Sequence, residues 1–352
     1  MEKKEKFIIA LCAVVTIAAG ILHYIGVNEI IAFSVSALAL ASLAVVVGDA
    51  TEQLGRRLGP GATGVLQSAL GNLPELFVSI FALRAGLANV VQAALIGSIL
   101  GNLLLILGLA LLFGGLKNGT QRFNSEPPRM IATLMLLAVG ALIIPTLTKE
   151  LHTPAEPYIN NLDIACSIVL LILLGASIYF SVKGDPAVAP QKEQMGEHAQ
   201  WSLGLTIGVL AGAGIGAAFV SEWFVAELEP AMAALSLSET FTGLVIVAIA
   251  GNAIENLVGI QLAWRNQADY AVSVILNSSL QIALGLIPIL VLLSFVLGGS
   301  ILTLVLPPLL VAALALAAIV SAFIVYDGES IWIEGLALIG LYFIIAAAFW
   351  WG

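Results

Sequence analysis

The chain consists mostly of long apolar runs, and their length is the feature that most limits how it can fold. Apolar runs of about 18 residues or more recur from end to end, and each is long enough to cross a hydrocarbon layer roughly 30 Å thick. Hydrophobic residues make up 60% of the chain and charged residues only 10%, against about 25% charged in soluble domains. The sequence lacks the alternating ten-residue segments typical of membrane β-barrels. It therefore predicts an all-α polytopic membrane protein.

The apolar runs predict eleven transmembrane helices. The predicted spans are 7–24, 29–55, 62–84, 88–115, 129–148, 161–183, 201–227, 239–265, 269–297, 301–326 and 331–351. The first run could instead be a secretory signal peptide, because the charged stretch "MEKKEK" precedes a short apolar core. No A-x-A-like cleavage site follows that core, so we expect a retained helix.

Basic residues fall unevenly on the two sides of these spans. If the N-terminus is cytoplasmic, the inner loops hold 11 of the 13 Lys and Arg residues, and the outer loops hold only Arg84 and Lys149. Basic residues concentrate in the cytoplasmic loops of membrane proteins. The sequence therefore predicts a cytoplasmic N-terminus and, with eleven spans, a C-terminus outside.

Two copies of a short polar motif relate the two halves of the chain. "GNLPEL" occupies residues 71–76 and "GNAIEN" residues 251–256. The alignment that places Gly71 over Gly251 also places "LIGSILGNLLLILG" (95–108) over "ILNSSLQIALGLIP" (275–288). Five spans separate each element from its copy, so the two copies cross the membrane in opposite directions. This is an inverted repeat, the plan of many secondary transporters.

The repeat predicts four parts of the chain. Residues 1–28 are expected to form an N-terminal transmembrane helix, residues 29–183 the first five-helix repeat and residues 201–352 the second. The stretch 184–200 between them contains Pro, Gly and mixed charges, as expected of a cytoplasmic linker.

Each motif places one carboxylate deep in a predicted span. Glu75 and Glu255 lie about fifteen residues into their spans, where a charged group costs about 2.5–3.5 kcal/mol or more. A single buried Glu could be a protonated structural residue, but two in register within an inverted repeat favour a function. Asn72 and Asn252 precede the acids by three residues, a spacing that predicts one shared helix face in each copy. We expect the two motifs to face each other near the membrane midplane.

Residues that weaken a helix accompany the acids. Pro74 has no N–H, so it frees the carbonyl of Leu70 and predicts a kink there, while Gly71 and Gly251 loosen the backbone. Non-helical backbone at this depth is tolerated only where it is buried in protein or lines a cavity. Carboxylates, amide oxygens and freed carbonyls together form an all-oxygen shell, which is the ligand set of hard cations such as Ca²⁺.

The same two acids also predict that protons are the counter-ion of the transported cation. When no cation is bound, two neighbouring carboxylates in a low-dielectric cavity repel each other and are poorly solvated, so each tends to hold a proton. A divalent cation binds only as those protons leave. Cation and protons therefore compete for one site, which predicts exchange of one for the other.

Polar side chains on the neighbouring spans lie in register with the motifs. Ser98 and Asn102 belong to the first copy, and Asn277, Ser278 and Gln281 to the second. Such residues in membrane helices are often packing contacts between helices, but their register with the acids favours a role at the site. Ser98, Ser278 and Gln281 are candidate ligands, and Asn102 and Asn277 are candidates for the accessory route of the ions. We expect Ser278 and Gln281 to bond across the axis to the Asn and Glu groups.

Acids nearer the membrane surfaces are candidates for an ion route. Glu52 aligns with Glu222 at a slightly shorter spacing than the one that relates the two motifs, and one lies near each face. They could lead protons or cations to the site; equally, Glu52 could pair with Arg56 and both acids could be solvated. Asp49, one turn earlier, is a weaker candidate. An outer loop is predicted to hold three solvated acids, Glu227, Glu229 and Glu239.

At these motifs the chain resembles the calcium/proton antiporters (the CAX family) of the cation/calcium exchanger superfamily. The resemblance rests on "GNLPEL", "GNAIEN", "GSILGNLLLILG" and "NSSLQIALG" in one plus five plus five spans, and covers nearly the whole chain. It implies Ca²⁺ extrusion or sequestration driven by a proton gradient, with Glu75 and Glu255 as the central acids. The residues that the resemblance places around them are Asn72, Asn252, Ser98, Ser278 and Gln281, with Glu52 and Glu222 as an accessory pair.

Three positions bear on the ion coupling that the resemblance implies. Leu-Pro before Glu75 is similar to the sodium/calcium exchangers of the same superfamily, which makes Na⁺ coupling the alternative. Asn72 stands where those exchangers usually carry Thr or Ser, and it favours protons. Asn256 stands where many calcium/proton antiporters have His, so no role for that His is carried over.

The sequence thus predicts a secondary antiporter that exchanges Ca²⁺ for H⁺ by alternating access, and not an enzyme. An intramembrane hydrolase is disfavoured because HExxH and GxSxG motifs are absent from the sequence, and a passive channel needs no pair of titrating acids. The expected partners are the transported Ca²⁺ and H⁺ and the lipid bilayer. No cofactor is expected and, without a basic footprint, no nucleic acid; a homo-oligomer is left open. The short linker and the lack of a long leader favour a prokaryotic plasma membrane.

Overall fold

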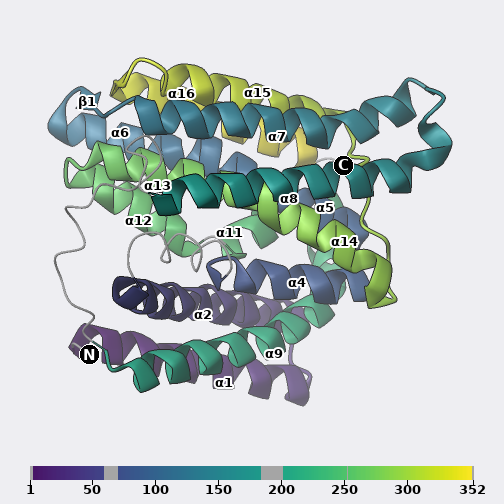
Figure 1. The fold of residues 1–352 in the computed structure, drawn as a ribbon. Helices are drawn as coiled ribbons and strands as arrows, with labels where there is room; N and C mark the ends of the chain where they lie inside the picture. Colours follow the sequence, from purple (N-terminus) through teal and green to yellow (C-terminus); the bar gives the residue numbers. More distant parts are fainter. Residues whose placement is uncertain (1–2, 59–69, 184–200, 252, 351–352) are drawn as a thin grey trace.

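The computed structural model describes residues 3–58, 70–183, 201–251 and 253–350, and for residues 253–257 it describes the backbone alone. The described part is almost entirely helical (Figure 1). The elements of the first half are α1 (Lys3–Ile25), α2 (Glu29–Leu58), α4 (Leu73–Arg84), α5 (Ala88–Leu100), the π-helical η1 (Gly101–Ile106), α6 (Leu107–Asn118), β1 (Gln121–Arg122), α7 (Glu126–Glu150), the 3₁₀ turn η2 (Glu156–Tyr158) and α8 (Ile159–Lys183).

The second half has a similar succession of helices. Its elements are α9 (Leu203–Leu235), α10 (Glu239–Phe241), the π-helical η4 (Thr242–Val247), α11 (Ala248–Gly251), α12 (Ala253–Trp264), α13 (Ala268–Gln281), the π-helical η5 (Ile282–Leu286), α14 (Ile287–Leu297), α15 (Pro308–Ile324), β2 (Glu329–Ser330) and α16 (Trp332–Trp350). The short strands β1 and β2 pair antiparallel, which joins the segment before α7 to the segment before α16.

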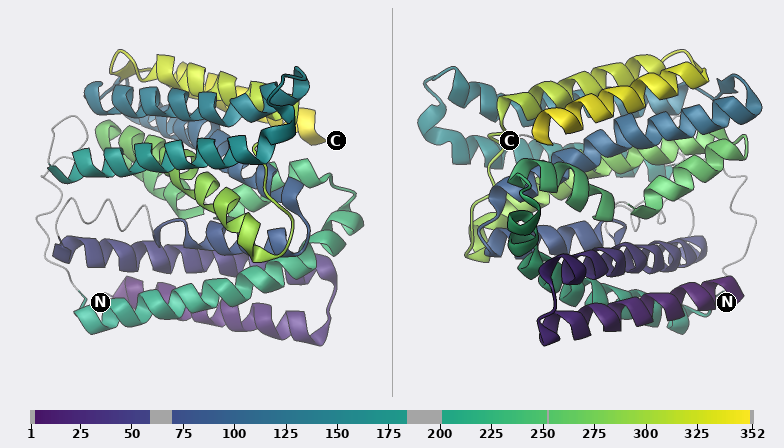
Figure 2. Two further views of the ribbon diagram at one scale, coloured as in Figure 1. Left: turned by 45° about the vertical axis from the view of Figure 1, so that its right-hand side comes forward. Right: turned by 180° about the vertical axis from the view of Figure 1, so that it is seen from behind.

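Three helices form a separate layer on one side of the molecule. The helices α1, α2 and α9 pack against one another (Figures 1 and 2), and we call them the α1–α2–α9 layer. Within it, Phe33 of α2 stacks on Phe224 of α9 with ring centroids 4.9 Å apart. The other helices, with α4 nearest to this layer, make up the larger body of the molecule (Figure 1).

Eight described helices are long and apolar enough to span a membrane, and they coincide with eight of the predicted spans. The predicted span 62–84 lies partly outside the described residues. In the span 239–265, residue 252 is not described, and the described helical stretches on either side of it, Glu239–Gly251 and Ala253–Trp264, are each shorter than a span. The span 301–326 contains a helix of only 17 residues. The total of eleven spans therefore stays a prediction.

An irregular segment replaces the first part of the predicted span 301–326. Residues 301–307 are not helical, and α15 begins at Pro308. Proline suits the first turn of a helix, where its missing N–H is not needed, but it would break a helix that continued through it. The prolines at 307 and 308 therefore set the boundary.

Buried side chains bind the backbone of this irregular segment. Thr146 of α7 donates a hydrogen bond to the carbonyl of Leu304 (3.1 Å) and accepts one from the N–H of Leu306 (2.9 Å). Asp163 of α8 accepts a hydrogen bond from the N–H of Leu304 (3.2 Å). Gln92 of α5 donates to the carbonyls of Thr303 (2.7 Å) and Val305 (3.2 Å). Backbone groups that are buried without a helix must find such partners, so these three side chains together allow the irregular segment inside the protein.

Helix α9 is longer than the sequence analysis predicts. It continues to Leu235, so Glu227 and Glu229 lie in a helix and their assignment to an outer loop is wrong. Glu239 is the first residue of α10. The carboxylate of Glu227 lies 3.0 Å from Nδ1 of His23 on α1. Glu227 of α9 thus has a polar partner on the neighbouring helix α1.

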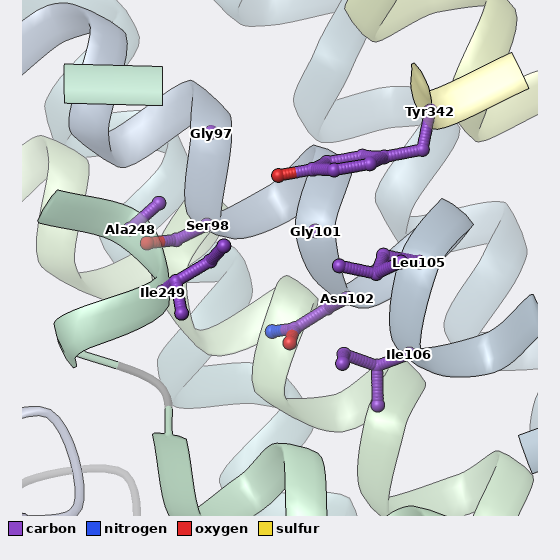
Figure 3. A pocket seen from close by; sticks show the side chains of 9 residues that line it. All are labelled: Gly97, Ser98, Gly101, Asn102, Leu105, Ile106, Ala248, Ile249 and Tyr342. Carbon is purple, nitrogen blue, oxygen red and sulfur yellow. The ribbon is translucent and has the colours of Figure 1, made fainter. Parts of the chain in front are cut away.

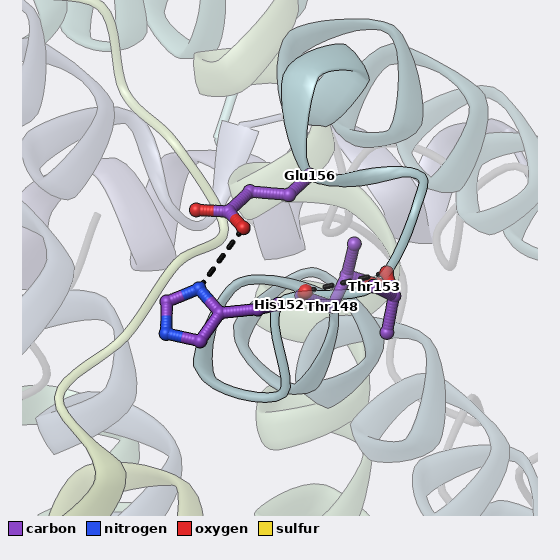
Figure 4. Close-up of polar contacts among 4 residues, drawn as sticks. All are labelled: Thr148, His152, Thr153 and Glu156. Atoms are coloured by element: carbon purple, nitrogen blue, oxygen red, sulfur yellow. Dashed lines mark hydrogen bonds and ion pairs between the residues drawn. The ribbon is translucent and has the colours of Figure 1, made fainter.

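A polar turn joins α7 to α8 (Figure 4). The hydroxyl of Thr153 donates to the carbonyl of Thr148 (3.3 Å), and Nδ1 of His152 lies 3.1 Å from the carboxylate of Glu156. His152 adopts a left-handed conformation with φ 47°, which is typical of residues that end a helix.

The alignment that relates the two sequence copies also relates helix bounds. When Gly71 is placed over Gly251, Leu73–Arg84 (α4) coincides with Ala253–Trp264 (α12) at both ends, and the first residue of α5, Ala88, coincides with that of α13, Ala268. A π-helical turn follows in each case, η1 and η5. In Figure 1, α4 and α12 extend from the middle of the molecule toward opposite ends. Because π-helical turns are rare and often occur at functional sites, this paired occurrence directs attention to the region between them.

Candidate ion-binding site

Glu75 lies where a helix begins again after a break. Gly71 and Asn72 form a turn, and α4 starts at Leu73 with Asn72 as its N-cap residue. Pro74 therefore occupies the first turn of α4, where proline is tolerated. The predicted kink within a continuous helix is wrong, because the chain breaks the helix completely before Pro74. Asn72 consequently precedes the helix instead of sharing one of its faces with Glu75.

This break gives Glu75 the N-terminal end of a helix. Glu75 is the third residue of α4 and half-buried. Unpaired N–H groups and the helix dipole at such an end favour a negative charge by about 0.3–1 kcal/mol or more. The broken helix thus offsets part of the free-energy cost of placing a carboxylate inside an apolar protein.

The side chain of Glu75 meets the second motif. A Cβ atom placed on Gly251 would lie 2.8 Å from Cγ of Glu75 and 3.0 Å from its Oε1. Any side chain at position 251 would therefore displace the Glu75 carboxylate. The acid of the first motif lies directly against the backbone of the second, which is the arrangement expected of two motifs that face each other.

The second motif is described only in part. Asn252 lies outside the described residues, and so does the side chain of Glu255. Glu255 is the third residue of α12, as Glu75 is the third residue of α4. A meeting of the two carboxylates therefore stays a prediction.

One oxygen of the first motif and one just before it are candidate acceptors for a cation. Asn72 is only 6% exposed, and its Oδ1 has no hydrogen-bond partner among the described residues. Leu70 precedes the break and is half-buried. Its carbonyl cannot bond to residue 74 in the helical manner, because Pro74 carries no N–H.

A hydrogen bond connects polar residues of the two copies. Nδ2 of Asn102, in η1, donates to Oγ of Ser278, in α13, over 3.0 Å. Asn102, Ser98 and Ser278 are all buried, with 2%, 5% and 4% of their surface exposed. Ser278 therefore bonds to a residue of the other copy, Asn102. The bonds expected from Ser278 and Gln281 to the Asn and Glu groups of the motifs stay a prediction. Asn277 and Gln281 lie half-buried on α13, on either side of Ser278.

The two accessory acids belong to the α1–α2–α9 layer. Glu52 lies on α2 and Glu222 on α9, and both side chains are exposed, whereas Asp49 is half-buried. The side chain of Arg56, the expected alternative partner of Glu52, lies outside the described residues. The exposure of both acids separates them from the buried polar groups around Asn102.

A small cavity adjoins Ser98 and Asn102 (Figure 3). Its walls come from α5, η1, α11 and α16. Tyr342 of α16, which is 2% exposed, directs its hydroxyl into this cavity. The sequence analysis does not include Tyr342, because it stands in an apolar run without a polar neighbour. One sequence signal could identify it: Tyr342 lies well inside a predicted span, away from the interfaces where tyrosines of membrane proteins concentrate.

The gathered donors suit a hard cation. The carboxylate, amide and carbonyl oxygens of Glu75, Asn72 and Leu70 lie at the start of α4, whereas Ser98, Asn102 and Ser278 offer hydroxyl and amide oxygens from within α5, η1 and α13. Among the described residues, no three or more His, Cys, Asp and Glu side chains gather into one group. Oxygen donors of this kind are typical of Ca²⁺ sites, whereas soft metals prefer thiolate and imidazole.

Comparison with known proteins gives matches along nearly the whole chain. A family model described as "Sodium/calcium exchanger protein" matches residues 28–183 and 205–351. The Ca(2+)/H(+) antiporter ChaA of Bacillus subtilis is 37% identical over 328 residues, which cover 90% of this chain and 91% of its own. The Ca(2+)/H(+) antiporter of Aphanothece halophytica is 35% identical over 345 residues, 93% and 92% of the two chains. The solved structure of native YfkE matches the fold with a TM-score of 0.83 at 33% identity, over 98% of this chain and 100% of that one.

Proposed function

The chain belongs to the sodium/calcium exchanger protein family, and on that premise we propose that it is a Ca²⁺/H⁺ antiporter. It is an integral membrane protein, and its relatives are transporters and not enzymes. Relatives named Ca(2+)/H(+) antiporter match at least 90% of its length. Their activity and the oxygen donors of the site support the same assignment.

In this proposal Glu75 and Glu255 share one site that holds either Ca²⁺ or protons. The observation that carries the proposal is the contact of the Glu75 side chain with Gly251, because it brings the first acid to the second motif. Further oxygens come from Asn72, Asn252, Ser98, Ser278, Gln281 and the carbonyl of Leu70. A buried carboxylate that has lost its cation is stabilised by a proton, so release of Ca²⁺ and uptake of H⁺ are coupled.

Access to the site alternates between the two sides of the membrane. The proposed route is lined by Glu52, Glu222, Asn102 and Asn277. The matching bounds of α4 and α12 support two inverted repeats of five helices each, a plan in which one part rocks against the other around a fixed site. The distribution of Lys and Arg supports a cytoplasmic N-terminus, in a prokaryotic plasma membrane.

The proposal is tested by Glu75→Gln, which keeps the size of the side chain and removes its charge. We expect H⁺-driven ⁴⁵Ca uptake into inside-out vesicles to fall about a hundredfold or more, because one buried charged ligand is lost. Glu150→Gln is the matched control, since Glu150 is exposed at the end of α7 and should leave uptake unchanged. Both variants are compared at equal amounts of monodisperse protein.

Wild-type uptake in the Glu75→Gln variant would overturn the proposed site. The coupling ion is tested separately, by replacing the pH gradient with a Na⁺ gradient of equal size. Uptake that follows only the Na⁺ gradient would replace H⁺ by Na⁺ as the counter-ion, the alternative that "LPEL" favours.

A further inference from the structure

The hydroxyl of Tyr342 is buried inside the body of the molecule. Tyr342 is 2% exposed, and its hydroxyl has no hydrogen-bond partner among the described residues. Buried polar groups in native proteins are nearly always satisfied by the protein or by ordered water. Tyrosine is selected for buried positions where its O–H reaches such a partner, so the cavity into which this hydroxyl points is where a partner is to be sought.

The packing of α16 fixes the position of Tyr342. A Cβ on Gly108 of α6 would lie 2.7 Å from the carbonyl oxygen of Gly335, and a Cβ on Gly335 would lie 2.5 Å from that of Gly108. The two helix backbones therefore touch at this point. Tyr342 follows Gly335 by seven residues and lies on the same buried face of α16. A backbone contact two turns away thus holds the phenol ring over η1.

The cavity has the size and the polarity to hold a water molecule. The space open to the centre of a water molecule is about 10 Å³, close to what one buried water occupies. Ser98 and Asn102, one helical turn apart, contribute polar atoms to its walls, and the Tyr342 hydroxyl faces them (Figure 3). Because Nδ2 of Asn102 is used by Ser278, the amide carbonyl of Asn102 remains as an acceptor. Three polar partners are enough to bind one buried water molecule.

We propose that Tyr342 is a positioning residue of the ion site, and that its hydroxyl holds one water molecule against Ser98 and Asn102. This inference rests on the proposed function, in which Ser98 and the Asn102–Ser278 pair belong to the ion site and its route. The water orients the Ser98 hydroxyl, a proposed ligand, and the amide of Asn102, which in turn bonds to the proposed ligand Ser278. Partners outside the direct ligands of a metal commonly set the orientation of the ligands and thereby the affinity.

The test is Tyr342→Phe, which removes one oxygen atom and keeps the ring. We expect the KM for Ca²⁺ in H⁺-driven uptake to rise about tenfold while the maximal rate stays unchanged. The Ca²⁺ concentration that gives half-maximal thermal stabilisation in detergent should rise by the same factor. Tyr158→Phe is the matched control, because Tyr158 is exposed in the α7–α8 connection. Tyr342→Met is a second variant without a hydroxyl, to be used if the Phe variant does not accumulate.

A wild-type KM and a wild-type Ca²⁺ stabilisation curve for Tyr342→Phe would overturn the inference. A lower thermal stability without any change in the Ca²⁺ dependence would also overturn it, since it would assign Tyr342 a purely structural role. These outcomes differ from failure of the proposed function, in which the wild-type protein shows no H⁺-driven Ca²⁺ uptake or Glu75→Gln retains it. If the proposed transport function fails in this way, the Ca²⁺ dependence of thermal stability in detergent still tests whether Tyr342 affects Ca²⁺ binding.

Discussion

The crossing of α5 with η4 and the contact of α2 with α9 both join the two halves of the chain, but they do so by different means. At the first, backbone meets backbone. A Cβ on Gly97 would lie 2.2 Å from the carbonyl oxygen of Leu244, and a Cβ on Gly243 would lie 2.4 Å from that of Val90. Glycine on both sides of the crossing is therefore a requirement of the fold.

The α1–α2–α9 layer is joined by side chains instead. Phe33 stacks on Phe224, and Gly216 of α9 lies against the side chain of Leu43 on α2, whose atoms can rotate away. Polar contacts of this layer lie toward its ends. They include the contact of His23 with Glu227 at one end and, at the other, the hydrogen bonds that Trp201 makes with Glu5, Gln53 and Arg57.

This difference teaches which part of the molecule can move. Two backbones in contact cannot slide past each other without clashes, because packed interiors do not deform continuously. A contact made largely by apolar side chains, whose atoms can rotate, can shift at a small cost in free energy. The comparison favours the α1–α2–α9 layer as the part that moves in the proposed alternating access, with the α5–η4 crossing as part of the fixed body.

The largest effect is expected from Gly97→Ala. The added methyl group would overlap the backbone of Leu244, so α5 and η4 must separate, and we expect a loss of about 3 kcal/mol or more of stability. The control is Gly212→Ala on α9, where a Cβ meets nothing within 4 Å and alanine favours the helix by up to about 1 kcal/mol. The measurements are the yield of monodisperse protein and the thermal unfolding midpoint in one detergent. A Gly97→Ala variant as stable as Gly212→Ala would contradict the assignment of the crossing as rigid.

A smaller effect is expected from Thr146→Val, which keeps the shape of the side chain and removes its hydroxyl. Both hydrogen bonds to the irregular segment 301–307 are lost, and buried backbone groups remain unsatisfied at a cost of about 1–3 kcal/mol. Thr133→Val on the same helix is the control, because Thr133 is exposed and bonds only within its helix. Thermal unfolding and amide hydrogen exchange of residues 301–306 measure the effect. Equal results for the two variants would show that Thr146 does not anchor the segment.

The features that the sequence predicts well are those encoded in length and repetition. Apolar length identifies eight helices that the structure describes, and the alignment of Gly71 with Gly251 locates matching helices within the two halves. Ser98 and Ser278 occupy equivalent positions in the two copies. A serine that recurs at one position of two apolar copies is expected to be buried, and both are.

The features that the sequence does not reveal depend on contacts between distant residues. The stretch "ILTLVL" reads as helix from its hydrophobicity. Hydrogen bonds from residues far away in sequence, namely Thr146, Asp163 and Gln92, satisfy the irregular backbone there. The end of α9 is misplaced because His23, far away in sequence, lies against Glu227. The sequence analysis misses Tyr342 because the role of its hydroxyl depends on the cavity that it faces, and that cavity is formed by other helices. It also misses the π-helical turns, because such turns have no sequence period of their own.

The smallest effect is expected from His23→Phe, which keeps an aromatic ring beside Trp223 and removes the contact with Glu227. Because both side chains are partly exposed, at 25% and 16%, and such pairs contribute little, we expect a change of about 1 kcal/mol or less in the free energy of unfolding. The control is His152→Phe, which removes a more exposed His–Glu pair from the body of the molecule. Thermal unfolding under one set of conditions compares the two variants. A loss as large as that of Thr146→Val would mean that polar contacts hold the α1–α2–α9 layer as firmly as the body is held, and the reason for assigning the movement to this layer would disappear.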